Sequence, residues 1–294
     1  MHRTKLESTI FTAEEESIMA KKHVLITGGS SGLGLAMAQQ LAKEDMKVTI
    51  VARNPQKLKN ALEELHKIHK DIYGVVADIS NSKSIQSIVS HIKEKGCVDF
   101  LVMNAGVVHV GTLLKMPESE LRADIEINLI GTMLCTKYLL PLLRKDARIL
   151  FVSSVLGLLA MAGYPAYCPA KAGIIHFAAV LRRELKNTKM QVYVACPADI
   201  DTPQYDYEFA HMPEWMKGDG GRPSAMTAAQ AATKILRKCR GGQWLITINF
   251  EVRLLLTLSK VLPQKIVDFI LDRMFPIPSV QDVFTENAID EKVE

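Results

Sequence analysis

The chain has 294 residues, of which 48% are hydrophobic, and a formal net charge of +4 at pH 7. This length and apolar content suit one large α/β domain, and the mild basic excess, without a long Lys/Arg run, argues against a nucleic-acid-binding protein. The five cysteines are scattered and no pair has metal-ligand spacing, so we expect a reduced chain that binds no metal.

Residues 1–22 are polar and include three consecutive glutamates at 14–16. They contain no apolar stretch of the kind that a signal peptide or an N-terminal anchor needs. We therefore expect a flexible N-terminal arm.

A strand, a glycine-rich turn and a helix are predicted between residues 23 and 41. Val24–Ile26 is a short apolar run typical of a buried strand, and Thr27–Gly34 has too much glycine for regular structure. Such a turn lets the backbone approach a pyrophosphate, and the helix behind it offers unpaired N–H groups. A purely structural turn is the alternative. The residues that we expect to bind a dinucleotide here are Gly28, Ser30, Ser31, Gly32, Leu33 and Gly34.

Strands and helices alternate along the rest of the chain. Further strands are predicted at 47–52, 72–77, 99–103, 148–152, 191–195 and 243–248, with helices at 55–69, 81–95, 117–143, 165–187 and 227–239. This alternation predicts an α/β fold with a doubly wound, Rossmann-type, seven-stranded parallel sheet covered on both faces. We place this single domain at 23–250, followed by a C-terminal apolar helical extension over 251–294.

Six residues lie at or just past the end of six different predicted strands: Gly28, Arg53, Asp78, Asn104, Ser154 and Pro197. Each alone could be an ordinary loop or cap residue. Ligands of open α/β sheets bind outside the carboxyl ends of the strands, so the six together predict one binding site at that edge.

Arg53 follows the second strand, where an acidic residue would bind the ribose 2′-hydroxyl of NAD. A guanidinium instead matches a 2′-phosphate, so the sequence favours NADPH over NADH, unless Arg53 is merely a surface residue. Asp78, after the third strand, could accept a hydrogen bond from an adenine amino group or could cap the next helix.

Tyr167 and Lys171 are four residues apart on a predicted helix and therefore share a face. A neighbouring ammonium would lower the pKa of the phenol and suit it to acid–base catalysis, although a solvated helix face would show the same spacing. Ser154 could donate to a substrate carbonyl or cap a turn. Asn128 could hold a water near Lys171 or satisfy backbone groups.

Five motifs occur in the order typical of the short-chain dehydrogenase/reductases, which the chain resembles over about residues 20–250: Thr27–Gly34, Asn104–Gly106, Asn128, Ser154 and Tyr167–Lys171. The resemblance implies hydride transfer between a nicotinamide cofactor and a carbonyl, with Asn128, Ser154, Tyr167 and Lys171 as the catalytic tetrad. Beyond the glycine turn, the cofactor-binding residues that we expect are Arg53, Asp78, Ile79, Asn104, Ala105, Gly106, Tyr167, Lys171, Pro197, Asp199, Ile200 and Thr202.

Two features depart from the family pattern. Met103 stands where an asparagine often precedes the Asn-Ala-Gly motif, and Cys168-Pro169 follows the tyrosine in place of small residues. Proline is tolerated only near the start of a helix, so we expect this helix to begin close to Pro165.

Three segments narrow the resemblance to members of the family that reduce a lipid-like ketone: Val51–Asn54, Phe151–Ser154 and Pro197–Pro203. This narrower resemblance implies the endoplasmic reticulum membrane, with the active site facing the cytosol. Two alternatives stay open. The chain could reduce another apolar carbonyl, such as a steroid, retinoid or fatty acyl ketone, or it could be a catalytically silent cofactor-binding scaffold.

The chain from Trp244 to Phe275 is unusually apolar. Glu251, Arg253 and Lys260 keep any uncharged span below the roughly 20 residues that a bilayer requires. We therefore expect an amphipathic or re-entrant segment at a membrane interface, with a domain-closing or oligomer-packing helix as the alternative.

The aromatic-rich segment 204–225 could be a mobile lid over the substrate or a packed loop. The family resemblance also implies a homodimer or homotetramer that pairs through the helices predicted at 117–143 and 165–187.

Overall fold

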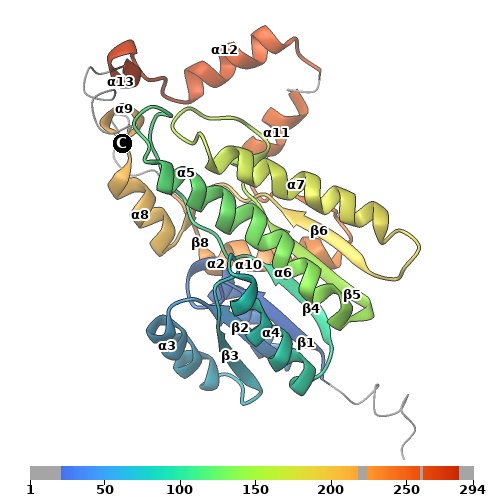
Figure 1. The fold of residues 1–294 in the computed structure, drawn as a ribbon. Helices are drawn as coiled ribbons and strands as arrows, with labels where there is room; N and C mark the ends of the chain where they lie inside the picture. The colour runs from blue at the N-terminus through green and yellow to red at the C-terminus, as the bar shows by residue number, and fades with distance from the viewer. Residues whose placement is uncertain (1–20, 218–223, 259–260, 285–294) are drawn as a thin grey trace, which may run out of the picture.

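The computed structural model describes residues 21–217, 224–258 and 261–284, so most of the predicted N-terminal arm lies outside the described residues. Its central sheet has seven parallel strands in the order β3-β2-β1-β4-β5-β6-β9 (Figure 1). The strands are β1 (His23–Thr27), β2 (Lys47–Ala52), β3 (Ile72–Val76), β4 (Val98–Met103), β5 (Leu143–Val152), β6 (Gln191–Ala195) and β9 (Leu245–Ile246). The predicted doubly wound parallel sheet is confirmed.

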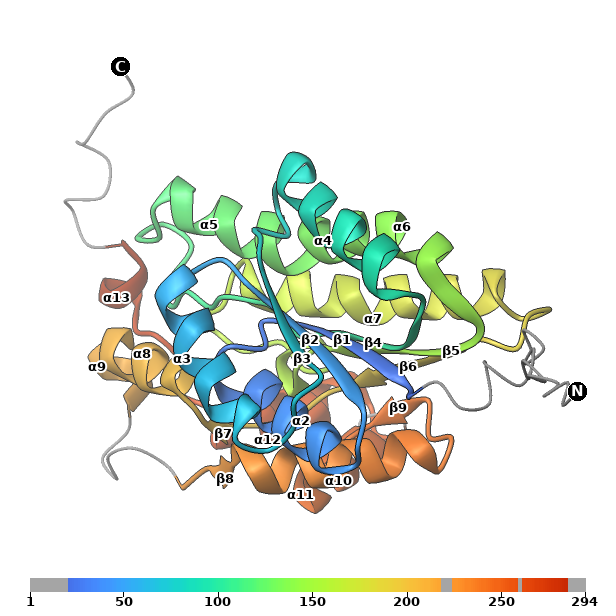
Figure 2. The ribbon, with the colours of Figure 1, turned by 90° about the horizontal axis from the view of Figure 1, so that it is seen from below.

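Helices cover both faces of the sheet, as Figure 2 shows. One face packs against α2 (Gly32–Lys43), α3 (Pro55–His66) and α10 (Ala228–Arg240). The other face packs against α4 (Ser82–Lys95), α6 (Thr132–Leu139) and α7 (Tyr167–Glu184). Because the sheet is buried on both sides, its inner strands are continuous apolar runs, and all five residues of β1 are buried.

The helix predicted at 117–143 is interrupted. It comprises α5 (Glu118–Ile125), a π-helical turn η1 (Glu126–Gly131), α6 and a 3₁₀ turn η2 (Leu140–Leu142). β5 therefore begins at Leu143, five residues earlier than predicted, and a register shift between Val98 and Phe100 accommodates the extra length. A π turn holds an additional residue within one helical turn, and apolar periodicity does not reveal it.

The boundaries of two other helices follow from local chemistry. α7 begins at Tyr167, two residues after Pro165, so Pro169 lies in its first turn, where a backbone N–H has no helical partner. α10 has the N-cap Thr227, whose hydroxyl accepts from the backbone N–H of Gln230 while the Gln230 side chain bonds back to Thr227. This reciprocal capping box defines the start of α10.

The aromatic-rich segment is largely helical where it is described. β7 (Ile200–Asp201) pairs with β8 (Met226–Thr227), and α8 (Pro203–His211) and α9 (Glu214–Lys217) lie between them. Residues 218–223 lie outside the described residues, and the mobility of the segment stays a prediction.

The C-terminal extension forms α11 (Phe250–Leu258), α12 (Gln264–Met274) and α13 (Val280–Phe284), and α12 stands apart from the sheet (Figure 1). α11 crosses the predicted boundary between residues 250 and 251, so the predicted domain division stays a prediction. Within the described part of the chain, no helix combines the length and apolar character needed to cross a membrane.

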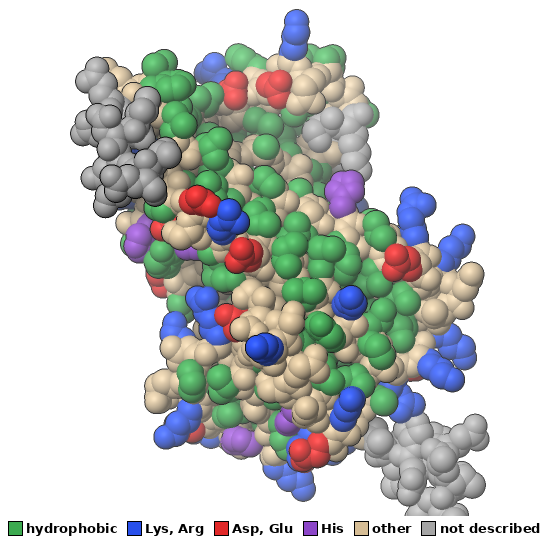
Figure 3. Space-filling view, viewed as in Figure 1, with side chains coloured by type: hydrophobic (Ala, Val, Ile, Leu, Met, Phe, Trp, Pro, Cys, Tyr) green, Lys and Arg blue, Asp and Glu red, His purple; other side chains and the backbone are tan. Residues whose placement is uncertain are grey.

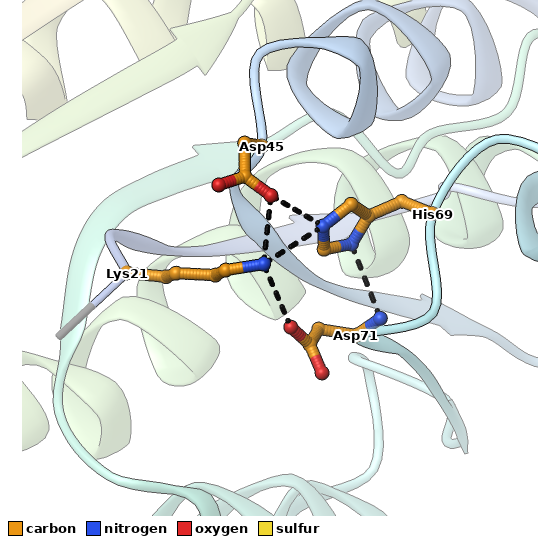
Figure 4. Close-up of polar contacts among 4 residues, drawn as sticks. All are labelled: Lys21, Asp45, His69 and Asp71. Carbon is orange, nitrogen blue, oxygen red and sulfur yellow. Dashed lines mark hydrogen bonds and ion pairs between the residues drawn. The ribbon is translucent and has the colours of Figure 1, made fainter.

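A polar cluster ties the start of β1 to the neighbouring loops (Figure 4). The Lys21 ammonium lies 2.7 Å from Asp45 Oδ1 and 3.2 Å from Asp71 Oδ2, and His69 Nε2 lies 2.8 Å from the same Asp45 oxygen. Because Lys21 precedes β1, the cluster lies at the amino-terminal edge of the sheet. The carboxyl-terminal edge is left for a binding site.

Candidate active site

A cavity of about 1030 Å³ lies at the carboxyl ends of the strands. All six residues that the sequence places at strand ends line it: Gly28, Arg53, Asp78, Asn104, Ser154 and Pro197. The sheet therefore brings together residues that are up to 169 positions apart in the chain, from Gly28 to Pro197.

The glycine turn forms one wall of the cavity. Gly28 and Gly32 have φ values of +65° and +52°, which favour glycine, and a Cβ on Gly28 would lie 2.8 Å from the Ala105 Cα. Ser31, the N-cap of α2, makes no capping hydrogen bond with its side chain, so the first N–H groups of this helix remain available to an anion.

Gly34 differs from the other residues expected to bind the cofactor, because it does not line the cavity. A Cβ there would lie 2.2 Å from the Gly28 carbonyl oxygen. Its lack of a side chain therefore allows α2 to pack closely against the turn.

The loop after β4 is joined to this turn by four hydrogen bonds. The Asn104 amide donates to the carbonyl oxygens of Thr27 (3.2 Å) and Gly28 (3.1 Å). The Thr27 hydroxyl accepts from the backbone N–H groups of Asn104 (3.0 Å) and Ala105 (3.2 Å). These bonds hold the backbone of Asn104, Ala105 and Gly106 against the cavity.

Two exposed cations, Arg53 and Lys57, line the cavity beyond β2. Lys57 was not among the predicted site residues. The Asp78 carboxylate also lines this end, but it accepts hydrogen bonds from the backbone N–H (2.9 Å) and hydroxyl (2.7 Å) of Ser80. Asn81, not Asp78, caps α4.

Most of the remaining residues expected to bind the cofactor also lie on the cavity wall: Ser30, Ser31, Gly32, Leu33, Ile79, Asp199, Ile200 and Thr202.

Ser154, Tyr167 and Lys171 come together on the cavity wall, from the end of β5 and the first two turns of α7. The Ser154 Oγ accepts from the backbone N–H of Leu156 at 3.1 Å, and its hydroxyl lowers the pKa of the Tyr167 phenol by hydrogen bonding. The Lys171 ammonium lies 5.4 Å from the centre of the Tyr167 ring and donates to the Val152 carbonyl oxygen at 3.3 Å.

Asn128 lies in the π turn behind the cavity wall and is fully buried. Its Oδ1 accepts from the Val107 N–H at 3.0 Å, and its Nδ2 donates to the Val107 carbonyl oxygen at 2.9 Å. The amide therefore satisfies backbone groups, which was the alternative role. That it also holds a water near Lys171 stays a prediction.

Burial acts in opposite directions on the two ionisable groups of this site. It raises the pKa of Tyr167, the charge of Glu208 raises it further, and the hydrogen bond from Ser154 lowers it. Burial also lowers the pKa of Lys171 to about 8, although the nearby Asp124 carboxylate opposes this. The predicted lowering of the Tyr167 pKa by Lys171 is not found, because burial is the largest influence on the phenol and raises its pKa. The phenol therefore keeps its proton at neutral pH.

The structure adds two polar pairs that the sequence analysis missed. Tyr164 donates from its hydroxyl to Glu208 Oε1 at 2.5 Å, and both residues line the cavity. His109 also lines the cavity, and its Nδ1 lies 2.9 Å from Oδ1 of the buried Asp124. Tyr164 precedes Tyr167 by three residues, but Glu208 lies in the aromatic-rich segment, where no motif marked it.

Away from the glycine turn the cavity wall is mostly apolar, apart from the side chains of Gln204, Glu208 and Lys217. Part of it comes from the loop before α7 and from α8–α9, and part from the C-terminal extension. The apolar lining residues there are Leu159, Met161, Phe209, Met212, Met216, Leu255, Met274, Phe275 and Pro276. The C-terminal extension is therefore part of the site.

A family model described as short chain dehydrogenase matches residues 22–212. A 3-ketodihydrosphingosine reductase from Dictyostelium discoideum is 27% identical over 92% of this chain and 88% of its own length. A 3-dehydrosphinganine reductase from Arabidopsis thaliana is 30% identical over 78% of this chain and 70% of its own. A 3-amino-tetrahydro-pyrrolizinone reductase from Xenorhabdus hominickii is 35% identical over 64% of this chain and 65% of its own.

Solved structures show the same fold. An actinorhodin polyketide ketoreductase matches with a TM-score of 0.70 and 24% identity, over 78% of this chain and 95% of that one. A protein from Burkholderia phymatum matches with a TM-score of 0.73 and 21% identity, over 88% of this chain and 98% of that one. At these identities the likeness concerns the fold alone.

Replacing Asn128 with alanine tests its role toward Val107. The substitution removes the partners of one backbone donor and one acceptor, so we expect the free energy of unfolding to fall by about 1–3 kcal/mol in urea titrations. Asn187→Ala, at an exposed position after α7, is the matched control and should leave stability unchanged. Equal stability of the two variants would show that the bonds from Asn128 to the Val107 backbone do not stabilise the fold.

Proposed function

The chain belongs to the short chain dehydrogenase family, and from this premise we propose that it reduces the ketone of 3-ketodihydrosphingosine to dihydrosphingosine with NADPH. Membership of the family makes it an oxidoreductase that uses a nicotinamide cofactor. The observation that carries the proposal is one cavity with a glycine turn at one end, Tyr167 and Lys171 in the middle, and an apolar wall beyond. Relatives that bear the name of this reductase support the substrate.

The residues at the glycine turn fit a dinucleotide. The Gly28–Gly34 turn leaves no room for a Cβ at Gly28 and leaves the N–H groups of α2 available, which suits a pyrophosphate. Arg53 and Lys57 supply positive charge where a 2′-phosphate would lie. When bound, the reduced nicotinamide supplies the hydride.

The chain's own residues supply the proton and the charge stabilisation. The Tyr167 phenol, protonated at neutral pH, donates its proton to the carbonyl oxygen, so that the ketone becomes a secondary alcohol. Ser154, which hydrogen-bonds with Tyr167, donates to the same oxygen as negative charge develops on it. The Lys171 ammonium stabilises the phenolate left behind, and the Asp124 charge favours the charged form of this lysine.

The apolar wall accounts for a lipid-like ketone. A long alkyl chain needs an apolar surface, and α8, α9 and the C-terminal extension provide one next to Tyr167. The proposed partner is therefore a small, lipid-like molecule.

Tyr167→Phe tests the proton-transfer step. The ring and its packing remain while the acid is removed, so we expect kcat for 3-ketodihydrosphingosine to fall by about 10²- to 10⁴-fold. NADPH affinity, measured by fluorescence titration, should stay within about twofold, because the affected step is the proton transfer. Undiminished turnover would rule out this scheme. Faster reduction of a steroid ketone than of 3-ketodihydrosphingosine by the unmodified chain would rule out the substrate.

Arg53→Ala tests the cofactor preference. If the guanidinium binds a 2′-phosphate, its loss should raise KM for NADPH by about 10- to 100-fold, the range expected for hydrogen bonds to a charged group. NADH lacks that phosphate and is the internal control, so its KM should hardly change. Equal changes for the two cofactors would contradict the assignment.

We propose that the C-terminal extension binds the endoplasmic reticulum membrane, with the active site facing the cytosol. Its support is a set of exposed apolar side chains on or beside α11–α13: Phe250, Leu254, Leu258, Val261, Ile266, Phe269, Met274, Ile277, Val280 and Phe284. Phe250 is 74% exposed and Phe269 60%. An exposed apolar surface of this kind suits a segment that lies in a membrane interface.

Phe250→Ser combined with Phe269→Ser tests this attachment. Each phenylalanine contributes about 1.5–3 kcal/mol when buried, so binding to phosphatidylcholine/phosphatidylinositol vesicles should weaken by about 100-fold or more in flotation assays. Neither side chain lines the cavity, so turnover of a short-chain, water-soluble analogue should persist. Vesicle binding equal to that of the unmodified chain would refute the proposal.

We also propose a homodimer or homotetramer that pairs through the face formed by α5, α6 and α7. Ile130, Met133 and Val180 are exposed there, and apolar side chains gather on this face in Figure 3. Light scattering coupled to size-exclusion chromatography should then give two or four times 32.7 kDa. A mass of one chain would refute this arrangement.

A further inference from the structure

Among the acidic groups, Glu208 has the largest influence on the pKa of the Tyr167 phenol. It lies on α8, and its carboxylate accepts a hydrogen bond from Tyr164, whose ring centre lies 6.1 Å from that of Tyr167. After burial, the charge of Glu208 is the largest influence on the pKa of Tyr167. The Glu208 carboxylate is therefore linked through the Tyr164 side chain to the ring of Tyr167, the residue that donates the proton.

The surroundings of Glu208 disfavour a negative charge. Its partner Tyr164 belongs to an apolar cluster with Val108, Met212 and Met216. Burial raises the pKa of Glu208 to about 7, and the hydrogen bond from Tyr164 only partly opposes this. A buried carboxylate is costly unless it is paired.

Within the described part of the chain, no cation is paired with this carboxylate. None of the ion pairs formed by residues 21–217, 224–258 and 261–284 includes Glu208. An ionised carboxylate has about four lone-pair positions for hydrogen bonds, and Tyr164 occupies one. Because Glu208 lines the cavity, a ligand can reach the remaining positions.

We propose that Glu208, oriented by Tyr164, binds the protonated amino group on the carbon next to the ketone of the substrate. This inference rests on the proposed function, because 3-ketodihydrosphingosine carries such an amine beside its carbonyl. When the carbonyl oxygen meets the Tyr167 hydroxyl, the amine lies only two bonds from the carbonyl carbon. A carboxylate close to Tyr167 is therefore in a position to bind the amino group.

Binding of the ammonium also affects the chemistry. The negative charge of Glu208 raises the pKa of Tyr167, and an ammonium paired with this charge removes that influence. The phenol then becomes a better proton donor when the aminated substrate is bound. A ketone without the amine gains neither the ion pair nor this activation, so Glu208 selects 2-amino ketones from other apolar ketones.

The test compares two ketones with matched chains, 3-ketodihydrosphingosine and its deaminated analogue 1-hydroxyoctadecan-3-one, at saturating NADPH. In Glu208→Gln, which keeps the shape and removes the charge, kcat/KM for the aminated ketone should fall by about 30-fold or more, as for truncation of a buried charge pair. The value for the deaminated ketone should change less than about threefold. NADPH binding should persist, which confirms that the variant is folded.

Two further variants test whether the effect on the aminated ketone is specific to Glu208 and its partner Tyr164. Glu214→Gln makes the same chemical change at an exposed glutamate of α9 whose side chain pairs with Lys217, and it should leave both substrates unaffected. Tyr164→Phe keeps the ring and removes the hydroxyl, so it should weaken only the aminated substrate, and by less than Glu208→Gln.

The outcomes distinguish this inference from the function on which it rests. Equal losses for the two ketones in Glu208→Gln, or an unchanged preference for the amine, would overturn the role of Glu208 while the reductase activity stands. Failure of the unmodified chain to reduce 3-ketodihydrosphingosine would overturn the proposed function itself.

Discussion

The close junction between the glycine turn and the loop after β4 is the constraint on which the site depends. The order of the sheet reverses between β1 and β4, and the crevice opens at that point. Asn104 and Thr27 hold the two loops together through four hydrogen bonds, and Gly28 permits a contact that any side chain would block. Residues that are distant in the sequence therefore face one cavity from a rigid base.

Burial is then the main influence on the pKa values of the two ionisable groups in the site, Tyr167 and Lys171. A buried phenol keeps its proton and a buried ammonium loses its proton more easily, so Tyr167 and Lys171 have shifted in opposite directions from their ordinary pKa values. A protonated phenol is what reduction of a ketone requires. The acids Asp124 and Glu208 adjust this balance: Glu208 and Asp124 both raise the pKa of Tyr167, and Asp124 also raises that of Lys171.

Apolar periodicity and glycine spacing were sufficient to predict the sheet and the edge at which the site lies. The carboxyl ends of parallel strands meet by construction, so Arg53, Ser154 and Pro197 could be assigned to one site before any coordinates. Side-chain partners could not be assigned in this way. Asn128 bonds to Val107, and Glu208 meets Tyr164 only because α8 borders the cavity. Nor could the spacing of Tyr167 and Lys171 indicate that burial would raise the pKa of the phenol.

Because of the π turn, the site depends on how many residues lie between α5 and α6 as well as on which residues they are. In an α-helix each residue advances the chain by about 100° around the axis, since there are 3.6 residues per turn. Because the wide turn absorbs one extra residue, winding Glu126–Gly131 as ordinary α-helix with all its residues kept would rotate α5 relative to α6 by about that angle. Either the Asn128 amide or the Leu129 side chain, which abuts Gly173 of α7, would then lose its contact. The irregular turn thus allows Asn128 to bond to the loop at Val107 while the next residue, Leu129, packs against α7.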